Sequence, residues 1–334
     1  MAKEKFIFVD YLRAFSVFYI VGYWHLFNYT DAFPKYYNSV TSALTEIVLG
    51  LFVFISGFLI CISTKKSAGI IDLYKKRLVR IYPLYFLAVV VFFLYGLNDG
   101  ATTFKSLFFV SMIYTPAPMT LWFITMIMLF YLVAPIIARL SVSLKKYLVA
   151  ITLIMGLLLT FQLLIGSADI RIMIYFPCFC VGIYCATNGV QNRIFSIKYA
   201  ISFLFFGILA YGMQYMMKVD SWSIISLSKI PLILSFSYLI FAVSYQKRDI
   251  FVSSGFIEFL SYGSYAMYLF HRPTYITLKS LYFPENGTHQ ILYLVGFCLV
   301  LVTIISWSIQ KLYDKLYVAA NKLLEQNKRI GSLE

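Results

Sequence analysis

Apolar segments fill this chain almost from end to end, and their length limits the fold more than any other feature. Of the 334 residues, 61% are hydrophobic and only 13% are charged, which is more apolar surface than a soluble core can bury. A helix of roughly 20 apolar residues crosses the hydrocarbon layer of a membrane. We therefore predict an all-α polytopic membrane protein of about ten transmembrane helices, near residues 6–27, 45–63, 81–97, 119–138, 147–165, 172–187, 200–217, 224–244, 256–278 and 290–310.

The basic residues fall mainly on one side of these segments. With both termini inside the cell, 21 of the 28 lysines and arginines lie in inner segments, as the positive-inside rule requires. The sequence thus predicts cytoplasmic termini, a membrane domain over residues 1–311 and a basic cytoplasmic tail over 312–334. The net charge of +14 is explained by the inner loops and the bilayer, without nucleic acid. We expect a multi-pass protein of a bacterial inner (plasma) membrane.

The first segment contains two ionisable residues that a membrane helix rarely carries. Arg13 lies at its inner end, with Asp10 one turn before it, and His25 lies near its outer end. Such groups are costly inside a membrane unless they face a partner or a cavity. Arg13 and His25 are therefore candidates for chemistry, since imidazole is suited to general base catalysis. Alternatively, Arg13 extends to the inner surface and His25 is an interfacial residue.

Two further residues of the outer half are candidates beside His25. Glu46 opens the second segment, where its carboxylate would orient the imidazole of His25. His271 lies in the outer half of the ninth segment, at a depth similar to that of His25. Taken alone, Glu46 is equally well explained as a solvated loop residue and His271 as a packed one.

A basic motif follows the second segment. It supplies Lys75, Lys76, Arg77 and Arg80, and the two arginines lie on one face of a helix, where their guanidinium groups match phosphate oxygens. Anchoring under the positive-inside rule is the alternative explanation.

The remaining candidates are aromatic or sulfur-containing. Trp122 opens the fourth segment, where an interfacial tryptophan is the simpler interpretation. The five cysteines lie in apolar segments, three of them as C-x-C-x4-C, which is not a zinc or redox spacing. We expect buried cysteines, no metal site and no permanently bound cofactor.

Five short motifs resemble, in this order, those of the acyltransferase-3 family of membrane O-acyltransferases. They are VDYLRA (9–14) with His25, FVFISGFLI (52–60), KKRLVRIYP (75–83), LWF (121–123) with FYLVAP (130–135), and GSYAMYLFH (263–271). The resemblance covers residues 9–271. Lys76 stands where many members have arginine.

The resemblance implies transfer of an acyl group, most often acetyl, from cytoplasmic acyl-coenzyme A to a hydroxyl of a surface or lipid-linked glycan. Acetyl-coenzyme A, or another short acyl-coenzyme A, would be a co-substrate. The implied functional residues are His25 as the base, and Arg13, Arg77 and Arg80 toward the donor. As a mechanism, we expect Glu46 or His271 to orient His25 and Lys76 to help bind the donor. We also expect substrate or tunnel contacts from Asp10, Trp122, Tyr131, Tyr265 and Tyr268.

The spacing of Arg13 and His25 makes a geometric prediction. Twelve residues of straight α-helix turn the two side chains about 120° apart, whereas eleven would leave them about 20° apart. A π-bulge absorbs one residue. We therefore predict a bulge between Ser16 and Trp24.

Two other classes of function fit the same spans. A multi-span transporter of a glycan-related or acyl substrate would also have buried charge and a two-sided site, but the chain has no visible inverted repeat. In a scaffold of glycan assembly, the buried arginine and histidine would only form pairs. The oligomeric state is not predicted.

Overall fold

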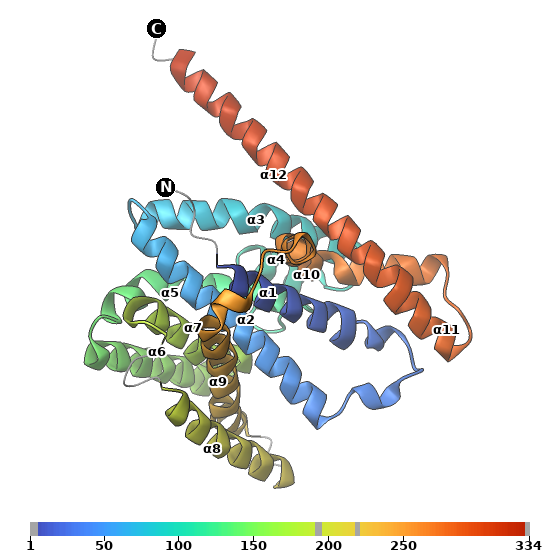
Figure 1. Ribbon diagram of the computed structural model, residues 1–334. Helices are drawn as coiled ribbons and strands as arrows, with labels where there is room; N and C mark the ends of the chain where they lie inside the picture. The colour runs from blue at the N-terminus through green and yellow to red at the C-terminus, as the bar shows by residue number, and fades with distance from the viewer. Residues whose placement is uncertain (1–5, 191–195, 218–220, 331–334) are drawn as a thin grey trace. The chain divides into compact units, whose positions relative to one another are not determined.

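Long helices make up most of the protein. The computed structural model describes residues 6–190, 196–217 and 221–330, and in these ranges it contains helices and loops but no strand (Figure 1). The helices of at least eight residues are α1 (Ile7–Tyr19), α2 (Ser39–Lys66), α3 (Ile70–Leu94), α4 (Gly100–Leu107), α5 (Trp122–Leu140), α6 (Leu144–Ile165), α7 (Ile170–Asn188), α8 (Ile197–Met216), α9 (Trp222–Gln246), α10 (Gly255–Leu281) and α12 (Leu299–Ile330).

Nine helical stretches of the described residues are long and apolar enough to cross a membrane. They correspond to nine of the ten predicted segments. The remaining one, near 256–278, is α10, whose 27 residues would span about 40 Å. It is less apolar than the other nine, because it carries several serines and tyrosines as well as Glu258, His271, Arg272 and Lys279. The sidedness of the termini stays a prediction.

The predicted bulge in the first segment is confirmed. Helix α1 continues directly into a π-helical turn, η1 (Ile20–Trp24), and the backbone N–H of His25 donates to the carbonyl of Ile20 at 2.9 Å, five residues earlier. The turn absorbs one residue, so His25 has the angular position that an eleven-residue spacing from Arg13 would give.

The helices form two compact units. Among the described residues, the first contains 6–9, 37–190, 196–217 and 221–252, and the second contains 10–36 and 253–330. In the first unit, α2 and α7 cross at two glycines, Gly57 and Gly182. A β-carbon on either would lie 2.1 Å from a carbonyl oxygen of the other helix, that of Phe179 or Phe54. Glycine thus permits backbone contact at the centre of this unit.

The second unit is built on α10, with α1 and α12 beside it. The backbone of Gly263 lies close enough to Trp307 that a β-carbon there would be 3.5 Å from its Cα. A short helix, α11 (Gly287–Leu292), and a second π-turn, η5 (Tyr293–Cys298), lead into α12. Helix α12 passes residue 311 without a break (Figure 1), so the described part of the predicted tail continues the last membrane helix.

Candidate active site

Three polar residues of the first segment, Asp10 and Arg13 on α1 and His25 at the end of η1, contact α10. A guanidinium nitrogen of Arg13 donates to Oγ of Ser264 at 3.0 Å, and Nδ1 of His25 lies 2.8 Å from Nε2 of His271. Ser264 and His271 are seven residues apart, which is two turns of helix and the same face. The π-turn is what allows His25, twelve residues after Arg13, to meet that face.

Asp10 continues this contact one turn earlier. Its carboxylate accepts a hydrogen bond of 2.8 Å from Oγ of Ser261. The structure therefore brings Asp10, Arg13 and His25 onto the helix that carries His271. The serines were not identified from the sequence. Ser261 lies two residues before the GSYAMYLFH motif and Ser264 lies inside it, and neither hydroxyl carries a signal of its own.

The contacts of His271 determine which nitrogen of each imidazole carries the proton. Nδ1 of His271 lies 2.9 Å from the carbonyl oxygen of Tyr268 and 3.2 Å from that of Met267. A carbonyl only accepts, so this nitrogen is the N–H donor, and Nε2 of a neutral imidazole is then an acceptor. The proton between the rings therefore belongs to Nδ1 of His25. Nε2 of His25 is left with its lone pair.

The histidine pair is closely packed. The ring planes differ by 4°, His271 is fully buried, and His25 is half-buried. The rings of Tyr268 and Tyr275 lie 6.1 and 6.3 Å from that of His271, and the hydroxyl of Tyr275 donates to the carbonyl of Val21 in η1 at 3.3 Å. The predicted Tyr268 thus packs beside the pair, and Tyr265 is half-buried on the same helix.

Arg77, in the first unit, is a cation surrounded by neutral groups. Its guanidinium donates to Oγ of Ser63 on α2 and lies 5.4 Å from the ring centre of Tyr131 on α5. Among the described residues, no carboxylate is within ion-pair distance of it. A half-buried arginine without a counter-ion is suited to bind an anion. Tyr131 was predicted, whereas Ser63 was not.

The other residues of the basic motif differ from Arg77. Lys76 forms an exposed ion pair of 2.7 Å with Asp72, one turn earlier on α3. Arg80 and Lys75 are exposed. Of these four residues, Arg77 is the one for which the described part of the chain shows contacts to side chains of other helices, which the spacing of the motif alone does not reveal.

Trp122 belongs to a cluster at the start of α5 and α7. The guanidinium of Arg171 lies 4.0 Å from the indole ring centre, and Nε of Arg171 donates to Asp169 at 2.8 Å. The ring of Tyr175 lies 6.2 Å away and nearly parallel to the indole. Asp169 also caps α7 by accepting from the backbone N–H of Arg171. The D-x-R pattern at a helix start was the available signal for this pair.

Glu46 forms an ion pair with Lys229. The lysine on α9 donates to Oε1 of Glu46 on α2 at 2.6 Å, and Oε2 of Glu46 is buried without a described partner. Both residues belong to the first unit. The orientation of His25 by Glu46 stays a prediction.

The described part of the chain contains no group of three or more histidine, cysteine, aspartate or glutamate side chains placed to hold a metal. The five cysteines are free and buried.

Comparison with known proteins agrees with the sequence motifs. The model of the acyltransferase 3 family, described as an acyltransferase domain, matches residues 6–310. A protein of the Acidianus two-tailed virus, described as a "putative acetyltransferase", is 27% identical over 237 residues, which cover 66% of this chain and 71% of the viral protein. No solved structure matches the chain.

Proposed function

Because the chain belongs to the acyltransferase 3 family, we propose that it transfers an acyl group, in the first instance acetyl, from acyl-coenzyme A to a hydroxyl of a surface or lipid-linked glycan. The observation that carries the proposal is the contact between His25 and His271. It provides an imidazole with a defined lone pair at the end of a membrane helix, which is what proton abstraction from a hydroxyl requires.

His25 is the general base in this proposal. Its Nε2 takes the proton of the acceptor hydroxyl while the hydroxyl oxygen attacks the thioester carbonyl. The carbon–sulfur bond then breaks, and the thiolate of coenzyme A takes the proton back from His25. Nε2 of His271 accepts a hydrogen bond from Nδ1–H of His25 whether His25 is neutral or charged. The imidazolium that forms during the reaction is therefore stabilised without any rearrangement.

Arg77 is the residue best placed to bind the donor phosphates. Its guanidinium has only Ser63 and Tyr131 as described partners, so its charge is not compensated by a carboxylate. We assign secondary roles toward the donor to Arg80 and Arg13. Lys76 is the weakest of the four because Asp72 already binds its ammonium group.

Aromatic side chains are assigned to the binding of the glycan acceptor. Trp122, fixed by Arg171 and Tyr175, offers an indole for contact with sugar. Tyr131, Tyr265 and Tyr268 are assigned to the substrate path, together with Asp10. Glu46 is kept as a second candidate for orienting His25. The bacterial inner membrane is the proposed location.

One assay separates the enzyme from its rivals. Purified protein in liposomes is given acetyl-coenzyme A with a radiolabelled acetyl group and a glycan oligosaccharide. The enzyme releases free coenzyme A only when the glycan is present, and the label moves to the glycan. Movement of unmodified glycan across the liposome would instead identify a transporter. The absence of both would leave the scaffold role and overturn the proposal.

A further inference from the structure

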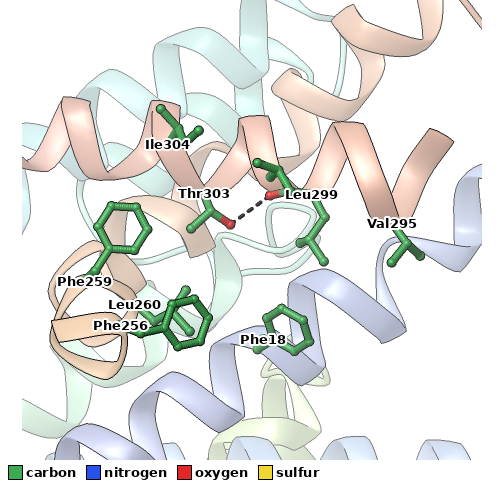
Figure 2. Close-up of a pocket in the computed structure, with 9 residues that line it drawn as sticks. Phe18, Phe256, Phe259, Leu260, Val295, Leu299, Thr303 and Ile304 are labelled. Atoms are coloured by element: carbon green, nitrogen blue, oxygen red, sulfur yellow. Dashed lines mark hydrogen bonds between the residues drawn. The ribbon is translucent and has the colours of Figure 1, made fainter. Parts of the chain in front are cut away.

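An apolar groove lies on the second unit between α1, α10 and the start of α12. Its volume is about 260 Å³. Figure 2 shows the ring of Phe18 from α1 on one side, the rings of Phe256 and Phe259 from α10 at one end, and Leu299 and Val295 along the helix that ends in α12. The groove is therefore a concave apolar feature on the second unit, and two of the three helices that form it, α1 and α12, belong to stretches that are long and apolar enough to cross a membrane.

The lining leaves no hydrogen-bonding group for a ligand. Thr303 is the one polar residue among those that line the groove, and its hydroxyl donates to the carbonyl of Leu299 in its own helix at 2.8 Å (Figure 2). All other lining side chains are hydrocarbon. A sugar, a phosphate or a peptide would leave polar groups unpaired there, whereas a hydrocarbon chain would not.

The groove borders the turn that positions the base. A β-carbon placed on Gly22 would lie 3.0 Å from Cδ2 of Leu299, so this lining residue packs directly on η1, three residues before His25. Phe18 precedes His25 by seven residues, roughly 10 Å along the helix. At the same end of the groove, Val295 lies in the second π-turn. Bulges of this kind are frequent at functional sites.

We propose that this groove holds the hydrocarbon chain of a lipid-linked glycan acceptor, an inference that rests on the proposed function. A chain lying along the groove ends at the level of the π-turn, which brings its polar end to the depth of His25. Lipid tails are as apolar as leucine, so the groove gains little from the hydrophobic effect within a bilayer. Its contribution is packing and orientation, which select one lipid position beside the base.

A kinetic comparison tests the groove. The acceptors are the same sugar as a farnesyl phosphate derivative and as a methyl glycoside. Val300 lines the groove and its side chain is 50% exposed, so Val300→Trp should fill the groove. Ile305 lies on the same helix, is 37% exposed and does not line the groove, so Ile305→Trp is the matched control. Val300→Trp should lower the ratio of kcat/KM for the farnesyl acceptor over the methyl glycoside by roughly 3- to 10-fold. Ile305→Trp should leave the ratio unchanged. An unchanged ratio in Val300→Trp would contradict the proposal.

A binding measurement keeps the groove testable without turnover. Protein in phosphatidylglycerol nanodiscs is photolysed with a farnesyl phospho-sugar that carries a diazirine on its chain. Label on peptides containing Phe18 or Phe259, displaced by unlabelled farnesyl phospho-sugar, supports the groove. If added phosphatidylglycerol displaces the photoreactive label equally well, the occupant is bulk lipid and the proposal is overturned. If the wild type acylates neither acceptor, the proposed function fails. The labelling experiment still tests whether the groove binds the hydrocarbon chain.

Discussion

A histidine acts as a base only if its proton sits on the nitrogen that faces away from the substrate. In this protein, the carbonyls of Met267 and Tyr268 place a proton on Nδ1 of His271, and the acceptor nitrogen of His271 then places a proton on Nδ1 of His25. The lone pair of His25 is thus determined by two carbonyl groups that it does not contact. At this scale, His271 is a positioning residue.

The role of His271 predicts an ordered effect of two substitutions. His271→Leu removes the acceptor for the His25 proton and should lower kcat by roughly 100-fold, within the range for general base catalysis, with little change in KM. His271→Gln offers a carbonyl oxygen near the original Nε2 and should recover part of kcat. The measurement is steady-state acetyl transfer with purified variants. Equal losses in both, accompanied by lost folding, would show that His271 is only structural.

The unpaired charge of Arg77 predicts a donor-specific defect. Arg77→Ala should raise KM for acetyl-coenzyme A by roughly 10- to 100-fold, as expected for a lost charge-assisted hydrogen bond. The same substitution should have no effect with S-acetylpantetheine, which lacks the phosphates. Lys75→Ala removes an exposed charge of the same motif and is the matched control. A defect of equal size with both donors would rule out a phosphate contact.

Single residues could be predicted from the sequence where placing the side chain in a membrane costs free energy. The cost of burying charge identifies Arg13 and His25 without a structure, and the spacing of the basic motif identifies Arg77 together with Arg80. Their partners Ser264 and Ser63 were not predictable, because a serine hydroxyl can bond its own helix and costs little. Nothing in the sequence joins Lys229 to Glu46, 183 residues away.

Two helical features set the geometry of the elements. The π-turn η1 realigns His25 with Arg13, and it was predictable because a spacing of twelve residues conflicts with a shared face. The close crossing of α2 and α7 was not predicted. Gly57 lies inside a motif of the family, but only the structure shows that Gly57 and Gly182 each face a carbonyl oxygen of the other helix.

This crossing predicts a large effect of a single methyl group. Gly57→Ala and Gly182→Ala each require the two backbones to separate and should destabilise the protein by about 2 kcal/mol or more. Gly156→Ala adds the same methyl group on α6, where nothing lies within 4 Å. It should be neutral or slightly stabilising. Unfolding of the three variants in detergent tests this, and wild-type stability of Gly57→Ala would contradict the close crossing.

At the scale of the whole molecule, hydrophobicity determines the fold class. The segment lengths predicted the long helices, since each must satisfy its backbone within itself in a bilayer. The division into two units was not predictable, because the second unit joins residues 10–36 with 253–330 and no periodicity links segments so far apart.

The transfer of acetyl label to a glycan by the His25→Ala variant tests the central claim most directly. Purified wild type and variant are compared with acetyl-coenzyme A and the glycan acceptor, and coenzyme A binding to both confirms that the variant is folded. We expect the variant to bind coenzyme A like the wild type and to transfer acetyl at least about 100-fold more slowly, since proton abstraction is lost. Transfer by the folded variant at the wild-type rate would contradict the assignment of His25 as the base.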